Sequence, residues 1–74
     1  MSPEKLVMMA NQIGKFFAPQ GEAKAVAGVA DHLAKFWDPR MRRQIQAHLA
    51  AGGAGLDPLV ATAIRSLPPA RAQV

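Results

Sequence analysis

The feature that most constrains this chain is a helix-start signal that occurs three times. Each copy is a residue with a capping side chain followed at once by proline: Ser2-Pro3, Asp38-Pro39 and Asp57-Pro58. A side-chain oxygen at such a position accepts a backbone N–H, and proline fits the first turn because its missing N–H would have no partner there. The segment Ala18-Pro19-Gln20-Gly21 should end one helix and let another begin. The sequence therefore predicts four helices, over about residues 3–17, 22–37, 39–51 and 58–67.

Each expected helix carries an apolar stripe at a spacing of three to four residues. The stripe of the first helix comprises Leu6, Met9, Ala10, Ile13, Phe16 and Phe17. The stripe of the second comprises Val26, Val29, Ala30, Leu33, Phe36 and Trp37. Because no segment alternates polar and apolar residues with a period of two, we expect no strand.

The expected fold is therefore all-α, a small bundle of about four short helices with no sheet. Residues 1–67 should form a single helical domain, in which the first two helices make an antiparallel hairpin with a tight loop. The prolines at 68 and 69 end the last helix, so residues 68–74 should form a flexible C-terminal tail.

Size and composition point to a partner chain. A domain of 74 residues is marginally stable alone, and this chain has no cysteine for a disulfide or a thiolate metal site. A partner is the remaining route to stability, and apolar residues meant for it could pair in a homodimer of the isolated chain. The net charge of +4 permits an acidic partner. No apolar run reaches the ~20 residues that cross a bilayer, and no signal peptide is evident at the N-terminus, so we expect a cytoplasmic protein.

Three arginines fall in the first turns of the helix expected at 39–51. They are Arg40, Arg42 and Arg43, and the partial positive charge at the start of a helix disfavours bases there. An acidic or phosphate-bearing partner would explain their position. The alternative is that they are solvated surface arginines, with Asp38 offsetting part of the cost.

Two aromatic residues, Phe36 and Trp37, precede these arginines. Aromatic residues at helical spacing are typical of a core, but tryptophan and arginine are also the residues most enriched in binding hot spots. Met8 falls on the polar face of the first helix, where it is either a lone surface hydrophobe or a contact with another chain. The sequence thus predicts a partner-binding surface formed by Met8, Phe36, Trp37, Arg40, Arg42 and Arg43.

The chain offers little for catalysis. A nucleophile needs a base and an orienting group, whereas Ser2 and Ser66 lie at the two ends, away from any acid–histidine pair. A metal site needs three or four ligands, and neither His32 nor His48 has suitable ligands at helical spacing. We therefore expect no catalytic residue, no metal ligand and no resident cofactor in this chain.

Several segments together resemble one protein family. They are Met9-Ala10-Asn11-Gln12-Ile13 with Phe16-Phe17, Ala30-Asp31-His32-Leu33, Phe36-Trp37-Asp38-Pro39-Arg40-Met41-Arg42, and Gly52-Gly53-Ala54-Gly55-Leu56-Asp57-Pro58-Leu59-Val60. Over about residues 8–67 the chain resembles the small delta subunit of the soluble, molybdenum-containing NAD-dependent formate dehydrogenase of bacteria. The Phe-Trp-Asp-Pro-Arg-Met string at 36–41 is the most specific part of this resemblance.

The resemblance implies an accessory function. In such complexes the larger subunits hold a molybdenum-pterin dinucleotide, iron–sulfur clusters and FMN, oxidise formate and pass the electrons to NAD. The delta subunit would dock on these larger subunits, with the catalytic subunit as the expected partner. It would support assembly, stability or cofactor loading. The arginine cluster would then meet an acidic protein surface, or transiently hold the phosphate-bearing molybdenum cofactor.

A small basic helical module that binds nucleic acid is the alternative function. The third helix is basic, but it offers little besides Gln44 and Gln46 to recognise bases. The charge outside this helix is nearly balanced, so we expect nucleic acid less than a protein partner.

Overall fold

Four α-helices make up most of the part of the chain that the computed structural model describes, residues 2–68. They are α1 (Pro3–Phe17), α2 (Glu22–Phe36), α3 (Pro39–Ala50) and α4 (Pro58–Ser66), and a short 3-10 turn, η1 (Ala18–Gln20), joins the first two. No strand occurs within residues 2–68. The predicted all-α bundle is confirmed, and every helix ends within one residue of the expected position. The predicted tail lies outside the described residues, apart from Pro68.

The helix starts follow the cap–proline pattern, with one exception. Ser2 Oγ accepts a hydrogen bond from the Lys5 N–H at 3.2 Å, and Asp38 Oδ1 accepts one from the Met41 N–H at 2.8 Å. Asp57 occupies the same position before α4, but its carboxylate caps no backbone N–H. Its own N–H instead donates to Asn11 Oδ1 of α1, at 3.0 Å. The start of α4 is therefore held by Asn11, which lies 46 residues away in sequence.

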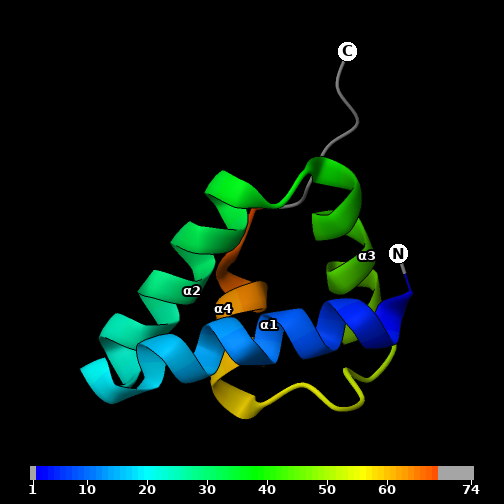
Figure 1. The fold of residues 1–74 in the computed structure, drawn as a ribbon. Helices are drawn as coiled ribbons and strands as arrows, with labels where there is room; N and C mark the ends of the chain where they lie inside the picture. The colour runs from blue at the N-terminus through cyan, green and yellow to red at the C-terminus, as the bar shows by residue number, and fades with distance from the viewer. Residues whose placement is uncertain (1, 69–74) are drawn as a thin grey trace.

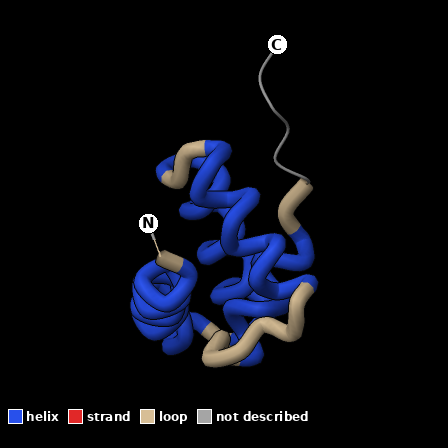
Figure 2. The backbone as a smooth tube through the Cα atoms, turned by 90° about the vertical axis from the view of Figure 1, so that its right-hand side faces the viewer, coloured by secondary structure: helices blue, strands red, loops and turns tan. Residues whose placement is uncertain are grey.

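The helices enclose one core (Figure 1). The helices α1 and α2 meet at the η1 turn, and from there they diverge, so the expected hairpin opens into a V; α3 lies near the other end of α1. The last helix, α4, packs against α1, α2 and α3. The tube view in Figure 2 shows the 51–57 loop running from α3 to α4. The buried core draws on all four helices: Leu6, Val7, Ala10, Val29, Leu33, Trp37, Ile45, Val60, Ala63, Ile64 and Leu67.

Small residues decide which faces of the first two helices are buried. Ala10, Gly14 and Ala25 are buried, so neighbouring helices can approach closely there. A Cβ added to Gly14 would lie 2.5 Å from Val60 Cγ2 of α4, closer than real contacts allow. Because α1 turns this small-residue face inward, Phe16 is 73% exposed. Phe16 therefore lies on the apolar stripe by spacing but outside the buried face of α1.

The 51–57 loop is fastened to the helices by side chains. Asn11 Nδ2 donates to the Gly55 carbonyl at 2.9 Å, in addition to the bond that Asn11 Oδ1 accepts from Asp57. His48 Nε2 lies 2.8 Å from the Ala54 carbonyl. These bonds fix where α4 begins, and with it the position of α4 beside α3. Among residues 2–68, no helix has the length and the apolar character that crossing a membrane would require.

Candidate functional site

The predicted partner-binding residues lie at two places. Met8 is on α1 and is 55% exposed, whereas the other five flank the turn between α2 and α3. Phe36, the last residue of α2, is 72% exposed, and its ring centroid lies 4.8 Å from that of His32 on the same helix. A phenylalanine this open to solvent presents apolar surface that no described part of the chain covers.

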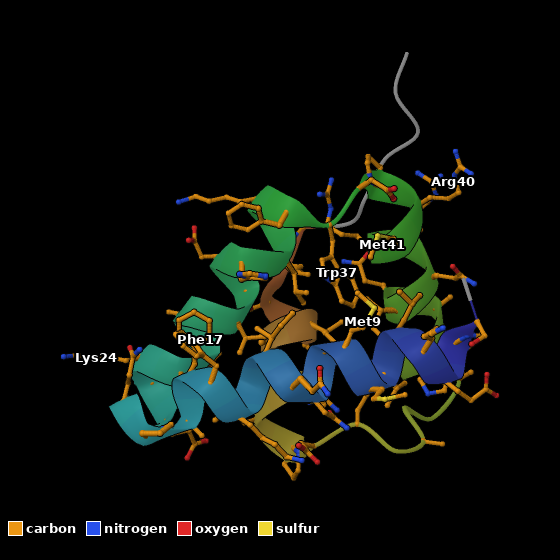
Figure 3. All side chains as sticks on the ribbon, viewed as in Figure 1. Met9, Phe17, Lys24, Trp37, Arg40 and Met41 are labelled. Atoms are coloured by element: carbon orange, nitrogen blue, oxygen red, sulfur yellow. The ribbon has the colours of Figure 1, made fainter. Side chains whose placement is uncertain are left out.

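Trp37 differs from its neighbour because it is buried. It is only 5% exposed and belongs to the core, and Figure 3 shows its side chain directed inward from the α2–α3 turn. The cause is helical periodicity: the Trp37 N–H still bonds the Leu33 carbonyl, so Trp37 continues the face of α2 on which Val29 and Leu33 are buried. The structure therefore does not support a place for Trp37 on a contact surface.

Arg42 has a partner inside the chain. Its Nη1 donates to the Ala34 carbonyl at 3.2 Å and also to the Trp37 carbonyl. These carbonyls lie in the last turn of α2 and just after it, where helix carbonyls lack intrahelical partners and the helix dipole favours a cation. Arg42 thus caps α2 from α3. This internal role explains its place in the first turns of α3 without an external partner.

Arg40 and Arg43 are the arginines of the cluster that face solvent. Within residues 2–68, neither guanidinium group has a hydrogen-bond or ion-pair partner. Figure 3 shows Arg40 extending outward from the start of α3. Phe36, Arg40 and Arg43 are the exposed residues that flank the α2–α3 turn, and we call these three residues the α2–α3 surface. Whether Phe36, Arg40, Arg43 or Met8 contacts a partner stays a prediction.

Charge divides the chain into two unequal halves. Residues 1–38 contain four lysines and four acids, so their net charge is zero. Residues 39–74 contain five arginines and a single acid, Asp57, which gives +4. All of the net charge therefore belongs to the half that includes α3 and α4.

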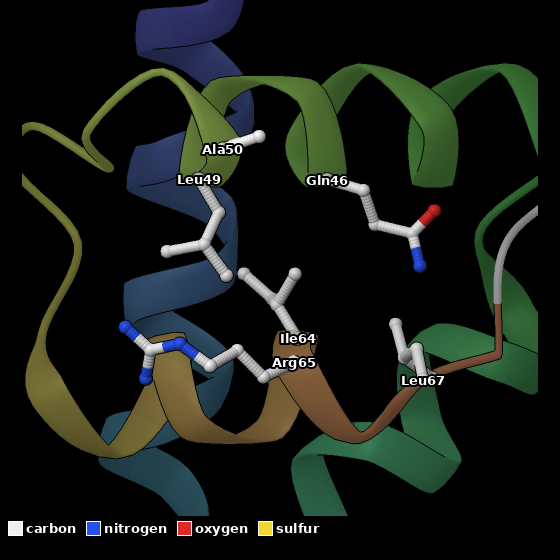
Figure 4. A pocket seen from close by; sticks show the side chains of 6 residues that line it. All are labelled: Gln46, Leu49, Ala50, Ile64, Arg65 and Leu67. Atoms are coloured by element: carbon white, nitrogen blue, oxygen red, sulfur yellow. The ribbon is translucent and has the colours of Figure 1, made fainter.

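A groove between α3 and α4 is the site that the sequence reasoning missed. It has a volume of about 400 Å³ and is mostly apolar. Figure 4 shows the six side chains that line it: Gln46, Leu49, Ala50, Ile64, Arg65 and Leu67. We call it the α3–α4 groove. The excess of arginine over acid in residues 39–68 is the signal in the sequence that points to this region. The groove itself leaves no local pattern, because it depends on packing between helices from separate segments.

The histidines lie apart from any cluster that suggests catalysis. His32 stacks on Phe36 in α2, and His48 of α3 bonds the Ala54 carbonyl. Within residues 2–68, no group of three or more His, Cys, Asp or Glu side chains is placed to hold a metal ion.

Comparison with known proteins identifies the family. A model of the family described as NADH-dependent formate dehydrogenase delta subunit FdsD matches residues 5–64. This confirms the resemblance found in the sequence and gives no support to a nucleic-acid-binding module. Neither a curated protein nor a solved structure gives a significant match.

Proposed function

This chain belongs to the FdsD family of formate dehydrogenase delta subunits, and we propose on this premise that it is a non-catalytic accessory subunit. It docks on the larger subunits of an NAD-dependent formate dehydrogenase in the cytoplasm and supports assembly, stability or molybdenum-cofactor loading. The observation that carries the proposal is the extent of the family match. Residues 5–64 include all of α2 and α3 and most of α1 and α4.

The chemistry of the chain is consistent with docking. In this proposal the molybdenum-pterin dinucleotide, iron–sulfur clusters, FMN and NAD are all held by other subunits, and the catalytic subunit is the first partner to test. Phe36 offers an exposed aromatic ring, and Arg40 and Arg43 offer charges with no partner within residues 2–68. Aromatic and arginine side chains are the commonest anchors of protein interfaces.

Co-expression with the larger subunits tests the proposal. Tagged chain should retain the larger subunits through purification. A preparation made without it should lose formate:NAD activity, molybdenum content or stability of the complex. If the larger subunits assemble fully without the chain, keep their activity and molybdenum, and do not bind it when it is added back, the proposal is wrong.

The α2–α3 surface is tested separately with charge variants. The double variant Arg40→Glu/Arg43→Glu should weaken co-purification, because it turns both unpartnered bases of this surface into acids. The double variant Lys15→Glu/Lys24→Glu is the matched control, because it changes the net charge equally at two exposed bases outside this surface, and Lys24 lies at the opposite end of α2 (Figure 3). Equal retention of the double variant and the control would exclude this surface from the interface. It would leave the proposed function intact.

A further inference from the structure

We infer that the α3–α4 groove receives an amphipathic helix of a larger formate dehydrogenase subunit, one whose apolar face is flanked by Asp or Glu. This inference rests on the proposed function and adds the place and the chemistry of docking. The apolar face of the incoming helix packs on Leu49 and Ile64. Its acidic flank meets Arg65.

The shape of the groove suits a short helix. Ile64 and Leu67 are almost fully buried and form the floor, whereas Leu49 is only partly buried and Ala50 is exposed. The small side chain of Ala50 leaves the space beside Leu49 open (Figure 4). The residues that line the groove span positions 46–50 of α3 and 64–67 at the end of α4, so at ~1.5 Å per residue the groove accepts the side chains of about one to two helical turns. Apolar anchors at i and at i+3 or i+4 would fill such a groove.

Charge selects the occupant. Arg65 extends along the groove wall in Figure 4. By helical periodicity, Arg43 shares a face of α3 with Gln46 and Ala50, which line the groove. Neither α3 nor α4 contains an acidic residue. The groove and its surroundings therefore attract an acidic segment and disfavour a basic one.

The same charge argues against the other occupants that the chain itself could supply. In a two-fold symmetric dimer formed through the groove, the half that carries +4 would meet the same half of the second copy. Residues 69–74 contain Arg71 and no acid, so they are not complementary to Arg65. An acid-flanked partner helix satisfies both the apolar floor and the basic wall.

Blocking the groove is the first test. Ala50→Trp places a large side chain in the groove, and because Ala50 is exposed the change should leave the fold intact. Ala47→Trp is the matched control, because Ala47 is also exposed on α3 but does not line the groove. Using the complex of larger subunits purified without this chain, we expect Ala50→Trp to weaken binding at least about tenfold. Ala47→Trp should bind like the unchanged chain, and circular dichroism should show that both variants remain helical.

The acidic flank is tested by reversing one charge. Arg65→Glu should weaken binding at least about fivefold, and it should reduce the loss of affinity with rising salt, because screening acts on that charge pair. Lys24→Glu, far from the groove, changes the net charge equally and should have a much smaller effect. If Arg65→Glu and Lys24→Glu weaken binding equally, net charge alone is responsible and the acidic-flank inference is wrong.

Cross-linking identifies the occupant. A photo-reactive phenylalanine analogue at position 50 should cross-link to a helix of a larger subunit that carries Asp or Glu beside an apolar face, and the analogue at position 47 should not. A cross-link to a second copy of the chain, or to a nucleic acid that co-purifies, would overturn the inference.

The outcomes separate the two proposals. If the unchanged chain does not bind the larger subunits, the proposed function fails first. If the unchanged chain binds and Ala50→Trp binds equally well, the groove is not the docking site and the accessory function stands.

Discussion

The two halves of the chain differ in charge but share one core. Residues 1–38, which form α1 and α2, are neutral and carry all the lysines, whereas residues 39–74, with α3 and α4, carry all the arginines and the net charge of +4. Packing follows a different division. The last helix, α4, has its most extensive contact with α2, while α3 packs on α1 and α4 and hardly touches α2.

This difference shows that the charge division does not mark two folding units. The basic half cannot be separated from the neutral half without exposing the core. The arginine-rich half is therefore not a unit that folds on its own. Of the arginines within residues 2–68, only Arg42 holds the two halves together, through carbonyls at the end of α2. Arg40, Arg43 and Arg65 are exposed, so their absence should cost the fold little.

Removing Trp37 should destroy the shared core. Trp37→Ala deletes a side chain that is 5% exposed, and such truncations cost about 3–5 kcal/mol. That is comparable to the whole stability of a domain this small, so the variant should lack a cooperative unfolding transition in thermal or urea denaturation followed by circular dichroism. Phe36→Ala is the control, because the neighbouring ring is exposed, and we expect it to change the free energy of unfolding by less than about 1 kcal/mol. Equal stability of both variants would refute the account of Trp37.

Adding one methyl group to Gly14 should damage the contact between α1 and α4. Helix propensity alone favours alanine by about 1 kcal/mol. The new Cβ would, however, lie 2.5 Å from Val60 Cγ2, and Val60 is fully buried and rotationally stiff. We expect a net loss of about 1–3 kcal/mol in the free energy of unfolding by urea denaturation.

Gly28→Ala provides a comparison for Gly14→Ala in the same urea denaturation experiment. Its new Cβ would also meet a close neighbour, the ring of Phe17 at 2.5 Å, but Phe17 is only partly buried and can rotate away. The loss should therefore be smaller than for Gly14→Ala. A stabilising Gly14→Ala would show that α4 can shift on α1 more freely than the fully buried Val60 suggests.

Removing the cap that Arg42 provides should have a smaller effect. Arg42→Ala leaves the Ala34 and Trp37 carbonyls without this donor, and because the site is partly open to water we expect a loss of about 1 kcal/mol. Arg43→Ala, one residue away with no partner within residues 2–68, should change the free energy of unfolding by less than about 0.5 kcal/mol. Chemical denaturation of the two variants side by side measures the difference, and equal values would mean that the cap contributes nothing.

Local signals made the helices predictable. The cap–proline pairs placed the starts of α1, α3 and α4 correctly. Capping by Ser2 and Asp38 involves residues within one turn of each other, and at α4, where Asp57 caps no N–H, the proline marks the first turn. The exposed phenylalanine was harder to predict. Phe16 belongs to the apolar stripe of α1 by spacing, whereas the residues that α1 and α2 bury include the small Ala10, Gly14 and Ala25. Burial at small residues leaves a weak hydrophobic signal in the sequence.

The candidate site was only partly predictable for a related reason. The sequence placed Phe36 and Trp37 together on the apolar stripe of the second helix, and only the packing shows that Trp37, four residues after Leu33, is buried while Phe36 is exposed. The capping role of Arg42 depends on how the chain bends between α2 and α3. The α3–α4 groove depends further on Asn11, which fixes the loop before α4 from 44 and 46 residues away in sequence. Contacts of that range leave no local pattern to read.

Because its charge is unevenly distributed, the molecule also takes a preferred orientation in an electric field. With a neutral half and a half that carries +4, the chain has an electric dipole moment as well as a net charge. In the field of an acidic protein such a dipole experiences a torque, which turns the arginine half forward before any atoms touch. Collisions would then be pre-oriented, and the encounter rate in dilute salt would exceed that of a chain with the same charges spread evenly.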